Sequence, residues 1–295
     1  MSRVPRSNAW FPALPLLAVS AGLALSALHA ADAPPPETSI KLQAADAALK
    51  RGDFAEAVKL ATQLINADPK DFRVIFLRAA AHEGAHDYAK ALADYDAGLK
   101  LNPNVPFGYQ NRGAVHFRLG HFAASVADFD RFIEAVPAQA PHHWQRGISL
   151  YYAGRYEDGR KQFESHQTVN PSDVENAVWH FLCLAKASGL EKARAALIPI
   201  ERDARVPMMQ IHALFAGKAK PEDVLAAAQA GAPAPAELES RLFYAHLYLG
   251  LYFDATNDAK LAREHIFKAA AMNADHYMGD VARVHAKTLR QLVNQ

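Results

Sequence analysis

The sequence predicts an all-α fold built from a repeated element. Four prolines, Pro69, Pro103, Pro137 and Pro171, recur at one constant spacing. The chain has 295 residues, of which 51% are hydrophobic, so it can bury a sizeable core and is not a disordered tail protein. Its single cysteine, Cys183, excludes an internal disulfide framework, a Cys-based zinc finger and a Cys-ligated iron–sulfur cluster. The prolines lie 34 residues apart, and this fixed period is the main structural signal in the sequence.

Other residue types follow the same period, and each has a physical role. Aromatic side chains fill the space between helices, and small residues let two helices approach closely. Glycine supplies left-handed backbone at a turn, and proline ends a helix. The periodic sets are the aromatic residues Phe54, Tyr88, Phe122 and Tyr156, the small residues Ala57, Ala91, Ser125 and Gly159, a second small set Ala45, Ala79, Gly113 and Gly147, and the turn residues Gly52, His86, Gly120 and Gly154.

These periodic sets resemble the tetratricopeptide repeat, a 34-residue helix–turn–helix element. The resemblance implies an α-solenoid of stacked helix–turn–helix repeats with a C-terminal capping helix. We place four repeats at 38–71, 72–105, 106–139 and 140–173.

The repeat pattern is weaker in the C-terminal part of the chain. We expect a degenerate repeat followed by irregular helices at 174–235, with Pro199 bending or ending the second helix of that repeat. The Gly- and Pro-rich segment 231–235 predicts a break. A further repeat is expected at 243–276 and a capping helix at 277–295, because a solenoid must cover its last apolar face.

The N-terminal segment predicts export from the cytoplasm. Residues 1–30 read as a signal peptide, with Arg3 and Arg6 at the start, an apolar run over 10–28 and small residues at the end. An uncleaved membrane anchor through the same apolar run is the alternative. Residues 31–37 predict a Pro-rich spacer. We therefore expect a periplasmic or secreted protein.

The charge balance argues against a nucleic-acid partner. The chain has 32 Lys+Arg against 31 Asp+Glu, a net charge of +1, so a broad basic face is not expected. Removal of the leader takes away two basic residues and no acidic residue, which leaves 30 against 31 and a net charge of −1. Shape and aromatic contact are therefore expected to select the partner more than charge does.

Two short patterns suggest a metal site or a catalytic thiol, and the repeat pattern argues against the metal site. The segment His82–His86 has the H-E-x-x-H spacing that places two zinc ligands and a base, Glu83, on one helix. However, His86 occupies the turn position of its repeat, so the helix should end there, and a catalytic zinc usually needs three protein ligands. The second pattern, His180 and Cys183, lies in an almost wholly apolar helix, which favours a buried, inert thiol. We expect no metal and no cofactor.

The concave face of the first helices is the expected partner-binding surface, since stacked repeats curve and present these helices inward. Exposed aromatic residues there would serve as binding anchors. The alternative is that they pack under an adjacent repeat or under the C-terminal helices. The candidates are Phe76, Gln110, Phe117, Trp144, Tyr151 and Tyr152.

A carboxylate clamp for acidic C-termini, known from this repeat family, is not expected. Leu42, Asp46 and Leu77 occupy positions where the clamp has other residue types.

Two segments show a finer resemblance. Trp144–Tyr152, with Trp179–Cys183, resembles bacterial and plastid tetratricopeptide proteins of unassigned role, and Leu249–Tyr252 followed by Ala262–His265 is similar to the end of periplasmic lipoproteins of the new-lipoprotein-I type. Those lipoproteins are adaptors for proteases and cell-wall hydrolases and are often dimers, so the resemblance implies an adaptor role and a homodimer. Their lipidated cysteine is absent here.

The sequence therefore predicts a non-catalytic scaffold or adaptor that binds protein or peptide segments on its concave surface in the cell envelope. Membrane contact is expected only through an uncleaved N-terminal segment. A structural subunit of an envelope complex is one alternative. A zinc-dependent hydrolase that uses residues 82–86 is the other.

Overall fold

A computed structural model describes residues 36–291 of the protein. These residues form fifteen α-helices and one short 3₁₀-helix, with no strand among them, which confirms the all-α prediction for this part of the chain. The predicted signal peptide, the alternative anchor at 10–28 and most of the 31–37 spacer lie outside the described residues. None of the described helices combines the length and apolarity needed to cross a bilayer.

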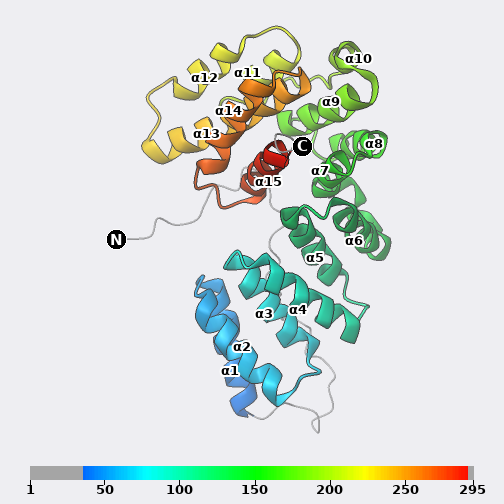
Figure 1. Ribbon diagram of the computed structural model, residues 1–295, viewed down its shortest axis with the longest axis vertical. Helices are drawn as coiled ribbons and strands as arrows, with labels where there is room; N and C mark the ends of the chain where they lie inside the picture. Colours follow the sequence, from blue (N-terminus) through cyan, green and yellow to red (C-terminus); the bar gives the residue numbers. More distant parts are fainter. Residues whose placement is uncertain (1–35, 292–295) are drawn as a thin grey trace. The chain divides into compact units, whose positions relative to one another are not determined.

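The chain divides into two compact units, an N-terminal unit ending at Gly108 and a C-terminal unit beginning at Tyr109. In the N-terminal unit each helix packs on the next, and α1 also contacts α3 (Figure 1). Its helices are α1 (Pro36–Lys50), α2 (Phe54–Ala67), α3 (Phe72–Gly84) and α4 (Tyr88–Leu101).

In the C-terminal unit, helices that follow one another in the chain also pack together. Its last described helix packs against α14 (Figure 1). Helix α5 (Pro106–Leu119) spans the boundary between the two units. The other elements are α6 (Phe122–Ala135), η1 (Pro137–His142), α7 (Trp144–Tyr152), α8 (Tyr156–Gln167), α9 (Val174–Ser188), α10 (Leu190–Ala195), α11 (Met208–Phe215), α12 (Pro221–Gln229), α13 (Pro235–Ala255), α14 (Ala259–Ala271) and α15 (Tyr277–Gln291).

The predicted turn positions adopt the left-handed backbone that ends the first helix of each repeat. Glycine adopts left-handed backbone angles without steric cost, and His86 adopts them although it is not a glycine. Aspartates next to two of these turns, Asp53 and Asp87, accept a backbone N–H of the following helix and so begin it. The φ angles are 76° at Gly52, 60° at His86, 85° at Gly120 and 74° at Gly154.

Glycine and phenylalanine set the distance between helices at several contacts. A Cβ atom on Gly98 of α4 would lie 2.4 Å from Cε1 of Phe76 in α3, and one on Gly147 of α7 would lie 2.6 Å from Cζ of Phe163 in α8. Real Cβ atoms do not approach so closely, so each ring occupies the space that a side chain would need. Gly147 belongs to a periodic small-residue set, and its role in close helix approach is as the sequence predicts.

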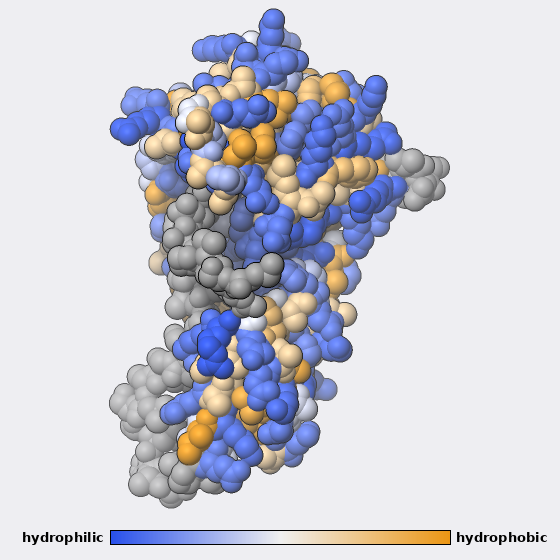
Figure 2. Space-filling model, turned by 90° about the vertical axis from the view of Figure 1, so that its left-hand side faces the viewer, coloured by the Kyte–Doolittle hydropathy of each residue, from blue (hydrophilic) through white to orange (hydrophobic). Residues whose placement is uncertain are grey.

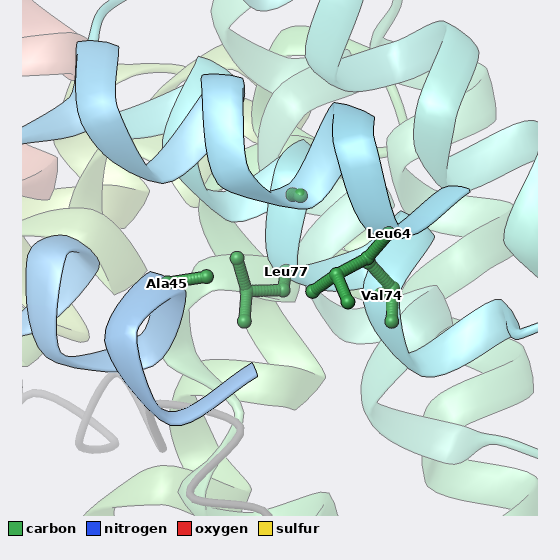
Figure 3. Close-up of a cluster of buried hydrophobic side chains, with 5 residues drawn as sticks. Ala45, Leu64, Val74 and Leu77 are labelled. Atoms are coloured by element: carbon green, nitrogen blue, oxygen red, sulfur yellow. The ribbon is translucent and has the colours of Figure 1, made fainter. Parts of the chain in front are cut away.

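One buried cluster of the N-terminal unit is shared by three helices. Ala45 of α1, Leu64 of α2, and Val74 and Leu77 of α3 meet in one buried cluster (Figure 3). Contacts of this local kind are expected where each repeat packs mainly on its neighbours. On the face of the protein seen in Figure 2, hydrophilic residues predominate and hydrophobic ones are scattered between them.

Helix boundaries differ from the sequence prediction at three prolines. Helix α10 ends at Ala195, so Pro199 lies in a non-helical segment beyond it and does not bend that helix from within. Helix α13 begins at Pro235, inside the predicted break, and α1 begins at Pro36, inside the predicted spacer. Proline at the first helical position lacks only an N–H that would have no intrahelical partner, so it starts a helix as readily as it stops one.

The contact between Gly98 and Phe76 predicts a stability effect. Replacement Gly98→Val should lower the free energy of unfolding by about 2 kcal/mol, because the added side chain overlaps the ring. Urea unfolding followed by circular dichroism measures this change. The double replacement Gly98→Val with Phe76→Leu should recover part of the loss by making space, and an equally large loss in the single and double variants would contradict the contact.

Candidate binding groove and buried polar sites

Two ion pairs join the paired helices of successive repeats. Arg78 donates to both carboxylate oxygens of Asp94 at 2.8 and 2.7 Å, and Arg112 donates to Asp128 at the same two distances. Bidentate pairs of this kind fix orientation as well as distance. Both members recur at the same positions of the next repeat, so a periodic Arg and Asp in the sequence could have revealed the pair. The third arginine in this register, Arg146, donates to Gln162 at the corresponding position and to the carboxylate of Asp130 in the preceding repeat.

The six predicted groove residues are buried or half-buried, so they do not form an open aromatic surface. This burial agrees with the alternative prediction, in which they pack under neighbouring elements. Phe76 of α3, for example, packs on Tyr95 of α4 with 5.9 Å between ring centroids. The exposed fractions are 4% for Phe76, 9% for Gln110, 0% for Phe117, 6% for Trp144 and 5% for Tyr151, and Tyr152 is half-buried.

Gln110 belongs to a buried hydrogen-bond chain. The backbone N–H of Arg146 donates to Nδ1 of His143, so the Nε2–H of His143 donates to Oε1 of Gln110 at 2.5 Å. The amide nitrogen of Gln110 in turn donates to Gln145 at 2.7 Å. Burial, reinforced by the charge of Arg146, lowers the pKa of His143 to about 3 and keeps it neutral. This chain is a structural link between α5 and α7.

Helix α15 covers aromatic residues of α5 and α7. The ring of Tyr277 stacks on Phe117 at 5.2 Å and meets Trp144 edge to face at 5.1 Å. The hydroxyl of Tyr152 lies 2.9 Å from Nδ1 of His285. Three of the six predicted residues thus form one surface, which we call the α5–α7 groove. Tyr151 lies edge to face with Tyr152 beside it.

A buried ion pair orients α15 in the α5–α7 groove. Nε of Arg118 in α5 donates to Asp280 at 2.6 Å, and Arg283 donates to the other oxygen of Asp280 at 2.7 Å. Burial alone would raise the pKa of Asp280, but the two guanidinium groups hold it below its ordinary value. Farther along α15, Nζ of Lys287 lies 3.4 Å from the carbonyl oxygen of Leu119.

The H-E-x-x-H segment does not form a zinc site. Helix α3 ends at Gly84, and His86 lies beyond it in the left-handed turn, where its Nδ1 is 2.7 Å from the hydroxyl of Tyr88. The carboxylate of Glu83 accepts a hydrogen bond from the hydroxyl of Tyr95 at 2.9 Å. Over residues 36–291 no group of three or more His, Cys, Asp or Glu side chains is arranged to hold a metal ion.

Cys183 is a core residue, as the apolar helix predicts. Its side chain is fully buried, and burial raises the pKa of the thiol well above its ordinary value. His180 points its Nε2 toward Glu164, 3.5 Å away. His180 and Glu164 also line a cavity of ≈ 470 Å³ between α8, α9 and the segment 195–199. The inert thiol is no candidate nucleophile for chemistry there.

A second buried network holds the non-helical segment between α10 and α11. Arg205 donates to Glu175 at 3.0 Å and to Asp173 at 2.6 Å, and it also pairs with Asp203. The hydroxyl of Tyr248 in α13 donates to Glu175 at 2.6 Å. Burial raises the pKa of Glu175 to about 8 in spite of Arg205. The network anchors this segment to α9 and α13.

Comparisons with known proteins identify the repeat. Two tetratricopeptide repeat family models match residues 42–106 and 77–146. A tetratricopeptide repeat protein from Parabacteroides merdae has a similar structure, with 14% identity, coverage of 87% of this chain and 100% of that chain, and a TM-score of 0.58. MamA from Desulfovibrio magneticus RS-1 is also similar, with 18% identity, coverage of 55% and 92%, and a TM-score of 0.51. At these identities the structures show the fold alone.

Buried neutral histidines predict loss of stability in acid. The pKa of His143 is about 3 in the folded protein and near 6.5 when unfolded, so between these values the unfolded chain binds more protons. The free energy of unfolding should therefore fall as the pH is lowered from 6.5. Between pH 6.5 and pH 4, the free energy of unfolding should fall by about 3 kcal/mol less in the His143→Gln variant than in the wild type. Urea unfolding at each pH measures this difference.

The matched control is His142→Gln, because His142 is the exposed neighbour. That variant should retain the acid dependence of the wild type. Equal slopes in all three proteins would contradict the assignment of His143.

Proposed function

This chain is a tetratricopeptide repeat protein, and we propose that it acts as a non-catalytic scaffold for protein–protein interaction. The observation that carries the proposal is the run of matched repeats over 42–146, whose helix pairs are held at fixed spacing by glycine–phenylalanine contacts and bidentate ion pairs. A rigid, preformed surface binds a partner segment at a low ordering cost. Two side chains suggested catalysis in the sequence, but His86 lies in a left-handed turn and Cys183 is buried in the core.

The finer proposal concerns the surface and the compartment. Partner segments bind on the inward face of the first helices, where the ring of Phe107, one turn before Gln110 in α5, is exposed, whereas Phe117 and Trp144 are covered by α15. Aromatic side chains are among the residue types that dominate binding energy at protein interfaces. The adaptor role and the envelope location rest on the resemblance to periplasmic lipoproteins and on the predicted signal peptide.

A reconstituted complex tests the scaffold function. Partners recovered with the tagged full-length protein from the envelope fraction of its native host are purified, and binding is then measured by calorimetry. We expect binding of a defined stoichiometry that Phe107→Ser weakens by at least about tenfold, because aromatic anchors carry most interface energy. The matched control is Val169→Ala, an exposed residue just beyond α8, which should bind like the wild type.

Two outcomes of this experiment would change the proposal. If no purified partner binds, the scaffold function is wrong. If a folded Phe107→Ser protein binds as tightly as the wild type, the inward face of the first helices is not the binding surface, and a structural subunit that binds through other faces is favoured.

Metal analysis tests the hydrolase alternative. Because His86 lies in a turn beyond α3 and contacts Tyr88, the purified protein should contain far less than one zinc ion per chain after dialysis against zinc-containing buffer. His86→Ala should leave that content unchanged. One zinc ion per chain that is lost in His86→Ala would restore the hydrolase hypothesis and overturn the non-catalytic one.

A further inference from the structure

The cavity of ≈ 470 Å³ beside α9 lies where the degenerate repeat departs from the regular pattern. Helix α10 packs on α9, and α9 packs on α8 (Figure 1). Helix α10 has six residues and ends at Ala195, whereas the second helices of the four regular repeats have 12 to 14 residues. The chain continues without helix over 196–200. The short α10 therefore leaves space beside α9 that a longer second helix would fill.

Two positions of the repeat change character in this degenerate repeat, and both line the cavity. In the three preceding repeats, an arginine of the first helix donates to a side-chain oxygen of the second helix. The pairs are Arg78 with Asp94, Arg112 with Asp128 and Arg146 with Gln162. At the corresponding positions of the degenerate repeat the sequence has His180 and Ala196. A methyl group forms no hydrogen bond, so this contact between side chains of the two helices cannot form here.

The imidazole of His180 keeps one polar neighbour and lacks another. Its Nε2 faces Glu164 of α8, 3.5 Å away, in the same register as the bond from Arg146 to Asp130 one repeat earlier. Its Nδ1 is buried and has no hydrogen-bond partner among the described residues. Because Nε2 faces a carboxylate, it carries the proton, and Nδ1 is then an acceptor. Burial lowers the pKa of His180 in spite of Glu164, so the ring is neutral at pH 7. The ring therefore presents an acceptor that lacks a donor.

The other walls of the cavity are apolar and reach the solvent. They are formed by the half-buried residues Leu184, Leu197 and Ile198 and the exposed residues Ala195, Ala196 and Pro199. The cation among the lining residues, Arg160, pairs with both Glu157 and Glu164. Two carboxylates against one guanidinium group leave a net charge of −1 at this end. An anionic ligand would therefore be repelled, whereas an ammonium group would find both an acceptor and an excess of negative charge.

We propose that this cavity is a binding site for a small aliphatic amine. The ammonium group donates to Nδ1 of His180 and lies against the carboxylate of Glu164, and the hydrocarbon part packs on Leu184 and Leu197. The ligand thus supplies the hydrogen bond that Ala196 cannot form. Apolar walls with a few polar groups, in a volume of this order, are typical of small-molecule sites. The inference goes beyond the proposed scaffold function and does not depend on it.

Binding of n-hexylamine to the full-length protein at pH 7 tests the proposal. The affinity is measured by NMR titration, and hexanoate is the probe of equal chain length and opposite charge. We expect saturable binding of one hexylamine molecule per chain. Hexanoate should bind at least about tenfold more weakly, because its carboxylate cannot donate to Nδ1 of His180 and is repelled by Glu164.

The variant Ala196→Gln tests the role of the changed repeat position. It introduces the amide that Gln162 provides one repeat earlier, and this amide can donate to Nδ1 of His180 and occupy the cavity. Hexylamine should therefore bind at least about tenfold more weakly, as expected from loss of a charge-assisted hydrogen bond. The exposed position of Ala196 favours a folded variant, which circular dichroism checks. The matched control is Ala187→Gln, the same replacement at an exposed alanine of α9 outside the cavity, which should bind like the wild type.

Three results would overturn the inference. The first is hexylamine binding that is absent, or no tighter than hexanoate binding. The second is unchanged hexylamine affinity in a folded Ala196→Gln protein. The third needs no variant with altered binding: long-range proton–nitrogen NMR spectra that place the proton of His180 on Nδ1 would remove the acceptor. None of these results bears on partner proteins, so the scaffold function is judged separately by the reconstituted complex.

Discussion

The close approach of two helices within each repeat is the constraint on which the rest of the structure depends. Where Gly98 faces Phe76 and Gly147 faces Phe163, the absence of a Cβ atom lets a ring fill the contact. The bidentate pair of Arg78 with Asp94 then fixes how the two helices are oriented. Because such contacts recur from one repeat to the next, the chain builds similar surfaces in succession, each stabilised mainly by local contacts.

That regularity explains how the α5–α7 groove arises. The first helices of two successive repeats, α5 and α7, bring Phe117 and Trp144 together although the whole of α6 separates them in the sequence. The groove is largely apolar, and the largely buried cation Arg118 lies at its edge. Such a surface requires an occupant, since exposed apolar patches of this kind are unfavourable in water. In this protein α15 is that occupant.

Departures from the regular repeat are stabilised by buried polar networks. The segment between α10 and α11 has no helix of its own, and Arg205 ties it to Asp173 and Glu175. The irregular 3₁₀ turn before α7 is fixed by His143, which bonds to Gln110. Such networks provide specificity where periodic packing is absent, and they make the stability of these regions sensitive to pH.

The sequence by itself determined the period, the helical class, the left-handed turns and the structural place of His86 and Cys183, because these follow from local backbone preferences and near-neighbour contacts. It also contained the Arg–Asp register, which the same period reveals. Only the tertiary structure decided that the aromatic residues of α5 and α7 are buried and that α15 buries them. Contacts such as Arg118 with Asp280 join positions 162 residues apart, and no local pattern of hydrophobicity or spacing encodes which distant helix fills a groove.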